Sequence, residues 1–235
     1  MGRSIGAWLA LFVLAVTGEA CYAQTWKEGT HYFAVNPPQH TSVAPGKVEV
    51  LEVFSYACPA CNAFQPTMKQ LRASLPPNAQ VAYLPASFRP DEDWPMFQRA
   101  FFAAQALGIV DRTHDAMFDA VWRTGELAIS DPNSHALKNP LPTIEDAARF
   151  YQRNAGVKPE TFLATAKSFS VDSKMKSADT QIGMSQALST PTVIVNGKYR
   201  LSAQTAGGYD QIIQLVKYLV ARESGGGSAV KAAGK

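Results

Sequence analysis

The spacing of apolar residues changes from a strand pattern to a helix pattern at residue 58. In residues 47–54, apolar side chains occupy both alternating positions and only Glu49 and Glu52 interrupt them, which predicts a strand covered on both faces. After this strand the spacing becomes helical, with one stripe formed by Cys61, Phe64, Met68, Leu71 and Leu75. We therefore expect a buried central strand that leads into an amphipathic helix, and we expect Pro66 to kink this helix.

Other runs along the chain predict the remaining strands. Residues 26–35 predict an edge strand, and residues 79–88 predict a strand that follows the helix. Strand, helix and strand in this order form a βαβ unit, so the two strands of the unit should be parallel. Residues 192–195 and 198–201 flank Asn196-Gly197, which is the strongest local hairpin signal. Together with the helices, these strands give an α/β fold class.

A block of helical patterns separates the early strands from the late ones. Residues 91–187 contain four or five consecutive helical stripes, which predict an inserted helical domain. Thr143 resembles a helix cap, Pro159 opens a short helix, and Ser170 is expected to cap the next one. The aromatic residues of these stripes are interpreted as core rather than as a ligand site. A last helix is expected after the hairpin, over residues 209–220.

The two ends of the chain differ in composition from the rest. Residues 1–23 combine Arg3 with an apolar run and small residues, which predicts a signal peptide and export. The apolar run is shorter than a typical membrane-spanning helix. In the alternative interpretation the leader is a lipoprotein signal and Cys21 is acylated. Residues 223–235 are rich in glycine and small side chains and predict a flexible tail.

Overall composition narrows the class of protein. Of the 235 residues, 46% are hydrophobic and 17% are charged, which is typical of a globular chain with a substantial core. The net charge of +3 comes without a polybasic run, so the sequence does not point to nucleic acid as a partner.

Cleavage of the leader after residue 23 would leave two cysteines, Cys58 and Cys61, and an oxidising compartment would let them form one disulfide. A loop this small removes little entropy from the unfolded chain, so an inert structural disulfide is the weaker interpretation. A metal site is an even weaker interpretation, because a structural zinc ion requires four ligands and the histidines show no ligand-like spacing. The pair is therefore interpreted as a redox-active dithiol that binds no metal.

Cys58 occupies the position of a nucleophile within this pair. A helix N-terminus offers free backbone N–H groups and a partial positive charge, which favour a thiolate over a thiol and lower the pKa of a cysteine there. Pro59 fits the first helical turn, because its missing N–H would have had no helical partner. One turn later, Cys61 is expected to face the core.

Several motifs occur together in a characteristic order: the strand, Cys58-Pro59-Ala60-Cys61, the helical interruption, and Thr190-Pro191 before a hairpin. With these motifs, residues 26–220 resemble a DsbA-type periplasmic thiol:disulfide oxidoreductase of the thioredoxin superfamily. The resemblance implies a thioredoxin-like domain made of residues 24–90 and 188–222, with residues 91–187 as its helical insertion. It also implies a periplasmic enzyme whose only cofactor is its redox-active disulfide.

The resemblance assigns roles within the active-site loop. Cys58 would be the attacking sulfur and Cys61 the resolving one, with Pro59 and Ala60 between them. Many DsbA proteins carry histidine at the position of Ala60, where it would add positive character and hydrogen bonding near the thiolate. We therefore expect Cys58 to be less acidic, and the disulfide less oxidising, than in a relative that carries this histidine.

The resemblance also assigns roles outside this loop. Pro191 would be a cis proline beside the disulfide, and the backbone of Thr190 would pair with an extended substrate chain. The alternative is an ordinary trans proline that starts an edge strand. Glu52 would be a buried acid that exchanges a proton with the leaving thiol. In the alternative, Glu52 is a satisfied or edge-exposed carboxylate, and Glu49, on the opposite face, is a second candidate.

The sequence therefore predicts a dithiol oxidase that donates the Cys58–Cys61 disulfide to reduced, unfolded exported proteins. The resemblance implies reoxidation by a membrane quinone reductase of the DsbB type, and we expect a monomer. Two alternatives stay open. One is a thioredoxin-fold reductase or isomerase, which Thr190 before the proline keeps possible, and the other is a secreted peptide-binding module with an inert disulfide.

Overall fold

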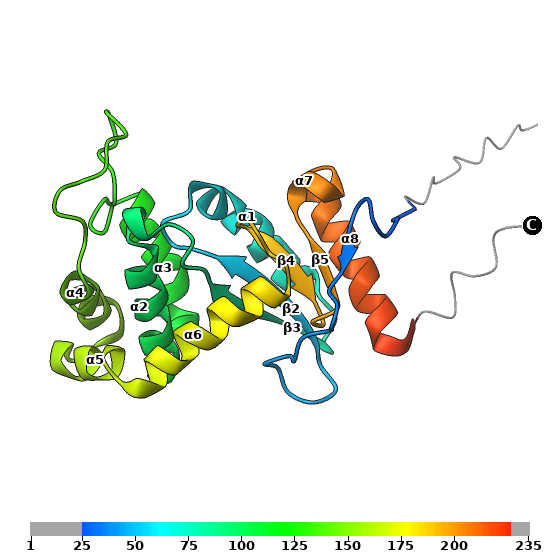
Figure 1. Cartoon of the computed structure of the whole chain (residues 1–235), viewed down its shortest axis with the longest axis horizontal. Coiled ribbons are helices and arrows are strands. Elements are labelled where there is room, and N and C mark those ends of the chain that lie inside the picture. Colours follow the sequence, from blue (N-terminus) through cyan, green and yellow to red (C-terminus); the bar gives the residue numbers. More distant parts are fainter. Residues whose placement is uncertain (1–24, 227–235) are drawn as a thin grey trace, which may run out of the picture.

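A five-stranded sheet forms the centre of the structure, a computed structural model that describes residues 25–226 (Figure 1). Its strand order is β1-β5-β4-β2-β3. In chain order the strands are β1 (Phe33–Ala34), β2 (Val48–Phe54), β3 (Ala79–Pro85), β4 (Thr192–Val195) and β5 (Tyr199–Leu201). β2 and β3 are parallel, and β4 and β5 form an antiparallel hairpin, so both pairing predictions are confirmed. The predictions on residues 1–23, including acylation of Cys21, lie outside the described residues.

The helices come mainly as one block between β3 and β4 (Figure 1). In chain order they are α1 (Pro59–Ser74), η1 (Pro90–Glu92), α2 (Trp94–Ala106), α3 (Val110–Trp122), α4 (Ile144–Ala155), α5 (Pro159–Ala166), α6 (Phe169–Met184), α7 (Ala203–Ala206), α8 (Tyr209–Ala221) and η2 (Arg222–Gly226). Within residues 25–226, no helix has the length and apolar character needed to cross a membrane. The boundaries proposed for the two domains stay a prediction.

Both faces of the sheet are covered, and every residue of β2 is buried. On one face, Val50 shares a core with Phe64 of α1 and with the apolar side of α8. On the other face, Leu51, Val53 and Ile194 share a second core with the block of helices between β3 and β4. The continuous apolar pattern of the central strand thus has the expected cause, which is burial on two sides.

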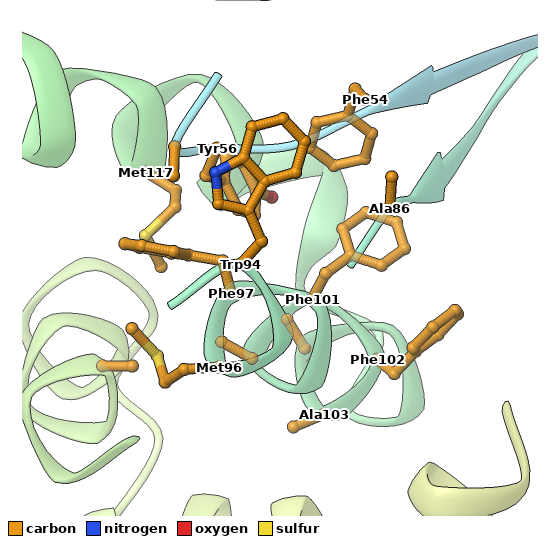
Figure 2. Close-up of a cluster of buried hydrophobic side chains, with 14 of the residues drawn as sticks. Phe54, Tyr56, Ala86, Trp94, Met96, Phe97, Phe101, Phe102, Ala103 and Met117 are labelled. Carbon is orange, nitrogen blue, oxygen red and sulfur yellow. The ribbon is translucent and has the colours of Figure 1, made fainter. Parts of the chain in front are cut away.

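Aromatic side chains of α2 pack against the end of β2 and the turn that follows it (Figure 2). The ring centroid of Phe101 lies 5.5 Å from that of Phe54, and the ring of Phe97 lies 6.4 Å from that of Tyr56. These rings are almost fully buried, as expected for core residues. Because Tyr56 lies two residues before Cys58, this contact holds the helical block against the segment that carries Cys58.

Three local expectations were wrong in detail. The edge strand is limited to β1, because residues 28–32 form a turn in which the Gly29 N–H donates to the Tyr32 carbonyl. β3 ends at Pro85, and the next residues leave the sheet toward the helices, where the Ser87 hydroxyl donates to Asp179 of α6. The cap of α6 is Ser168, whose Oγ accepts the Val171 N–H, so Ser170 lies inside the helix.

The last described residues pack against the sheet. η2 (Arg222–Gly226) extends past residue 223, the expected start of the tail, although its backbone is not helical at Gly225, where φ is 82°. The Glu223 carboxylate accepts hydrogen bonds of 2.6 Å from Lys198 and from Asn196. These bonds hold the C-terminal turn against the β4–β5 hairpin.

The turn of this hairpin requires glycine at position 197. Asn196 and Gly197 both have positive φ angles, of 51° and 67°, as a two-residue type I′ hairpin turn demands. The Gly197 carbonyl also accepts the Gln39 N–H at 2.9 Å. A Cβ at Gly197 would lie 2.1 Å from the Gln39 carbonyl oxygen, so a side chain would push this segment away.

Gly197→Ala is therefore expected to lower the free energy of unfolding by about 3 kcal/mol, through left-handed backbone strain and displacement of Gln39. Urea denaturation followed by circular dichroism measures this loss. Gly29→Ala is the matched control, because Gly29 has a φ of 79° and open space around its Cα. It should lose only about 1 kcal/mol. Equal losses in the two variants would show that the contact with Gln39 does not constrain residue 197.

Candidate active site

Cys58 is the N-cap of α1, at the junction between the buried strand and the helix. Its backbone is extended, with φ of −86° and ψ of 117°, and its N–H donates to the Ser55 carbonyl. Pro59 begins the helix and has no N–H, and the Cys61 N–H donates back to the sulfur, at 3.2 Å from Cys58 Sγ. The predicted position of Cys58 at a helix N-terminus is confirmed.

Hydrogen bonds to the sulfur lower the pKa of Cys58 to about 6. The largest contribution is the bond from the Cys61 thiol, and partial burial opposes it. The Thr190 hydroxyl, whose Oγ1 lies 3.2 Å from Sγ, and the backbone N–H groups of Cys61 and Ala60 add to the effect. All these donors favour the thiolate, because each stabilises negative charge on sulfur. At neutral pH the Cys58 side chain is therefore mostly ionised.

Cys61 has the opposite character. It is fully buried, whereas Cys58 keeps 4% of its surface exposed, so an incoming sulfur can reach only Cys58. Burial raises the pKa of the Cys61 thiol well above its ordinary value, and the hydrogen bond to the Cys58 thiolate and the charge of that thiolate raise it further. The two sulfurs are not joined by a disulfide in this structure, and at neutral pH the Cys58 sulfur is mostly charged whereas the Cys61 thiol is neutral.

Glu52 is completely buried in β2, which excludes the edge-exposed alternative. Burial raises its pKa to about 8; the nearby Cys58 charge also raises it, and Arg72 lowers it. Among the residues that the structure describes, neither carboxylate oxygen of Glu52 has a hydrogen-bond partner. A carboxyl in such surroundings is protonated at neutral pH and can release that proton to a stronger base.

Glu49 is also buried, but its carboxylate already has a structural partner. Its Oε1 accepts bonds of 2.7 Å from both the N–H and the hydroxyl of Ser42. This contact ties the segment before β2 to the strand. The Cys58 charge raises the pKa of Glu52, and the charge of Glu52 raises the pKa of Cys61, so Glu52 is the acid that is electrostatically linked to the pair.

Thr190 and Pro191 lie beside the cysteines, although the sequence separates them by more than a hundred residues. The Thr190–Pro191 peptide bond is cis, as the resemblance implied. The Thr190 carbonyl oxygen lies 3.7 Å from Cys58 Sγ, and the same residue's hydroxyl contacts that sulfur. Pro59 and Ala60 are exposed at the tip of the helix. The structure thus brings Cys58, Cys61 and the Thr190-Pro191 segment together at one site.

Two residues near Glu52, Tyr83 and Arg72, were not predicted from the sequence to belong to the site. Tyr83 lies opposite Glu52 in the parallel β2–β3 ladder, and its hydroxyl accepts a 2.5 Å hydrogen bond from the guanidinium of Arg72 on α1. Burial raises the pKa of Tyr83 to about 12, so its phenol stays neutral. The parallel pairing was predictable, but the register that places Tyr83 beside Glu52 was not, because nothing in the two strands fixes it.

The turn before Cys58 is held by the helical block through two further contacts. The Trp122 indole N–H donates to the Tyr56 carbonyl at 2.8 Å. The Tyr56 hydroxyl lies 2.9 Å from Nδ1 of His114, and burial lowers the pKa of His114 to about 3, so this imidazole is neutral. No cluster of three or more metal-ligating side chains occurs between residues 25 and 226.

Comparison with known protein families and curated sequences gives one consistent result. A family model described as thioredoxin matches residues 44–215. The thiol:disulfide interchange protein DsbA of Pseudomonas aeruginosa is 32% identical over 213 residues, which are 91% of this chain and 93% of the relative. The protein of the same name from Azotobacter vinelandii is 33% identical over 223 residues, covering 93% of this chain and 96% of the relative.

Solved structures show the same similarity. A crystal structure of the oxidoreductase DsbA from Xylella fastidiosa superposes with a TM-score of 0.72 at 28% identity, covering 84% of this chain and 97% of that one. A crystal structure of Pseudomonas aeruginosa DsbA has a TM-score of 0.69 at 30% identity, with 86% and 96% of the two chains covered. The similarity therefore includes the helical block as well as the sheet.

Proposed function

Because this chain belongs to the DsbA family of thiol:disulfide interchange proteins, we propose that it donates the Cys58–Cys61 disulfide to reduced proteins. Membership of the family establishes a thioredoxin-like fold and protein thiol:disulfide oxidoreductase activity, as predicted from the sequence. We propose in addition the direction of electron transfer, the roles of the individual residues, the cellular location and the partners.

The reaction proceeds through a mixed disulfide. A substrate thiolate attacks Cys58 Sγ, the Cys58–Cys61 bond breaks, and its electron pair leaves on Cys61. A second substrate thiolate then attacks the substrate sulfur of the mixed disulfide, so a substrate disulfide forms and Cys58 leaves as a thiolate. The substrate loses two electrons, which the protein keeps as two reduced cysteines.

The observation that carries this proposal is the set of hydrogen bonds on the Cys58 sulfur. The hydroxyl of Thr190 and the N–H of Cys61 both lie at 3.2 Å from Sγ, and together with the Cys61 thiol they hold the Cys58 pKa near 6. A sulfur with a low pKa leaves readily, and its stable thiolate favours the dithiol over the disulfide. Both effects favour donation of the disulfide rather than reduction of substrates.

Glu52 completes the chemistry by handling a proton. When Cys61 leaves as a thiolate inside the core, its pKa is far above that of the neighbouring carboxyl. Transfer of the Glu52 proton to Cys61 is therefore downhill and removes a buried charge from the sulfur. Arg72, which lowers the pKa of Glu52, stabilises the carboxylate that remains.

The test is the redox equilibrium of the protein in glutathione buffers, followed by thiol alkylation. We expect the disulfide to become reduced in weakly reducing mixtures, because the thiolate of Cys58 stabilises the dithiol. Titration of the thiolate absorbance of Cys58 in the same samples should give a pKa well below that of an ordinary cysteine. A disulfide that is reduced only under strongly reducing conditions would refute the oxidase and favour a reductase or isomerase.

Ala60→His should make the disulfide more oxidising in the same equilibrium. The substitution places a hydrogen-bonding, partly positive side chain at an exposed position beside the Cys58 thiolate. We expect the equilibrium constant to shift toward the dithiol by about tenfold, which corresponds to one unit in the pKa of Cys58. Ala73→His, at the exposed far end of α1, is the control and should leave the equilibrium unchanged. No shift, or a shift toward the disulfide, in the first variant would contradict the argument.

We place this activity in the periplasm, with reduced, newly exported proteins as substrates and a quinone-linked membrane enzyme as the oxidant that restores the disulfide. The support is the leader-like composition of residues 1–23 and membership of the DsbA family. The protein is proposed to act as a monomer. Its substrate thiols are supplied by exported chains that have not yet formed disulfides.

A further inference from the structure

A small groove opens next to the Thr190-Pro191 segment. It has a volume of about 200 Å³ and lies between that segment, β5 and α7. Its lining includes Leu188, Ser189, Thr192, Arg200, Gln204 and Thr205. Figure 1 shows the end of α6 reaching the sheet near β4 and β5, and Gln186, just after α6, also borders the groove. Polar side chains form most of this lining, and Leu188 stands on the rim with 85% of its surface exposed.

Arg200 is the charged residue among those that line the groove. It lies in β5, opposite Ile194 of β4 and Phe33 of β1. The Phe33 ring supports the guanidinium from one face, with 4.8 Å between the guanidinium carbon and the ring centroid. This contact fixes the plane of the cation and leaves its edge, which carries the N–H donors, free to bind.

Most of the donors of Arg200 are unused. One long hydrogen bond of 3.3 Å joins its Nη2 to Oε1 of Gln186, whereas its Nε is buried and has no acceptor within the described part of the chain. Between residues 25 and 226 no carboxylate forms an ion pair with it. A guanidinium has five N–H donors and matches a carboxylate with two parallel bonds. Among the described residues, Arg200 is therefore a preformed site without an anionic partner.

We propose that Arg200 selects substrates: reduced chains that carry an aspartate or glutamate close to the reacting cysteine bind with that carboxylate on Arg200. This inference rests on the proposed function, because it requires an extended substrate to pair with the backbone of Thr190 while its cysteine meets Cys58. Ile194, the cross-strand partner of Arg200, is three residues beyond Pro191, or about 10 Å along the strand. An extended substrate covers this distance in about three or four residues.

The test uses oxidised protein and short peptides with a single cysteine. In one series, an aspartate is moved through the four positions on each side of the cysteine; in the matched series, asparagine takes its place. The rate of mixed-disulfide formation is measured by acid quenching and mass spectrometry. At the best position the aspartate peptide should react about fivefold faster than its asparagine partner, as expected for one partly exposed charge pair.

Arg200→Gln should bring the two rates within about twofold of each other, because the glutamine keeps a polar side chain but no charge. Lys217→Gln removes an exposed cation from α8, outside the groove, and should keep the full preference. Equal rates for the two peptide series with the unmodified protein would overturn the inference, and so would an unchanged preference in Arg200→Gln.

A salt titration of the unmodified protein provides a second test that does not depend on folding of the variant. The aspartate preference should decline as ionic strength rises, whereas a preference that is independent of salt would overturn the inference. If no peptide of either series reacts, the proposed function itself fails and the inference fails with it. Reaction of both series at one rate would instead leave the proposed function standing and refute only the role of Arg200.

Discussion

Cys58→Ser is expected to abolish oxidation of a reduced substrate protein, measured as disulfide formation in a substrate with two cysteines. The hydroxyl of serine cannot form a disulfide, and Cys61 alone is fully buried and cannot meet an incoming thiolate. The expected loss is complete rather than partial, because no other described cysteine is present to replace the missing sulfur.

The variant should keep its fold, so that its inactivity reports chemistry. Cys58 is the N-cap of α1, and its sulfur accepts the Cys61 N–H. Serine is among the best N-cap residues and can accept the same bond through its oxygen. Urea denaturation at pH 5, below the Cys58 pKa of about 6, should therefore give a midpoint close to that of the reduced unmodified protein. Oxidation that persists in this variant would refute the dithiol mechanism and favour a peptide-binding module with an inert disulfide.

Cys61→Ser supplies the complementary result. This variant keeps the attacking sulfur but has no resolving sulfur, so its Cys58 should form a mixed disulfide with an activated substrate and hold it. The adduct is measured by mass spectrometry and should disappear on reduction. If Cys61→Ser and Cys58→Ser form adducts equally, the assignment of Cys58 as the attacking sulfur is wrong.

The sequence correctly predicted those features of the structure that depend on the residues of a single segment. The apolar run before Cys58 predicted a strand buried on both faces, and the switch to helical spacing placed Cys58 at the start of α1. Both follow from local periodicity and from the preference of proline for the first turn. The Asn196-Gly197 hairpin was predictable for the same reason, because the turn fixes its own backbone angles.

The contacts that adjust the site come from segments far apart in the chain. Tyr83 meets Glu52 through the register of a parallel pair, and Arg72 reaches Tyr83 from a different element. Arg200 faces the groove only because β5 lies beside β4 and Phe33. Periodicity predicts which side of an element is buried, but not which residue of another element it meets. The start of α6 was predicted less accurately for a local reason. Ser168 and Ser170 are both good N-cap residues, and the sequence around them does not show which one caps the helix.

Glu52→Gln is expected to change how the stability of the oxidised protein depends on pH. In the unfolded chain Glu52 ionises above its ordinary pKa of 4.5, whereas in the reduced folded protein burial, with a smaller effect of the Cys58 charge, raises that pKa to about 8. The oxidised protein lacks the thiolate charge but keeps the burial, so its Glu52 pKa is still raised. The folded state therefore binds an extra proton between these two values, and stability falls as pH rises through this window. For the unmodified oxidised protein, the loss of unfolding free energy should reach about 3 kcal/mol by pH 8.

The reduced protein should not show this decline over the whole window. Hydrogen bonds lower the pKa of Cys58 from its ordinary value of 9.0 to about 6, so its ionisation adds stability as pH rises between these values. From about pH 6 to pH 8 the effects of Glu52 and Cys58 have opposite signs and largely cancel. Urea denaturation of both redox forms at a series of pH values measures the difference.

In Glu52→Gln the oxidised protein should lose the decline between pH 4.5 and 8, because glutamine has no proton to release. Glu49→Gln is the matched control: it removes a carboxylate from the same buried strand, where Ser42 is the partner, and should keep the decline. A flat profile for the unmodified oxidised protein would contradict the raised pKa of Glu52. A decline that persists in Glu52→Gln would assign the effect to another group.

Glu52→Gln also tests the role of Glu52 in catalysis, which is measured as the rate of substrate oxidation and not as the free energy of unfolding. Below pH 8 the unmodified protein holds a proton on Glu52 that Cys61 can take as it leaves, and Glu52→Gln has none. Substrate oxidation at pH 6 should therefore be at least about tenfold slower in the variant. The difference should narrow above pH 8, where Glu52 is ionised in the unmodified protein and donates no proton. A constant ratio of rates across this range would mean that Glu52 acts through the structure of the site rather than through its proton.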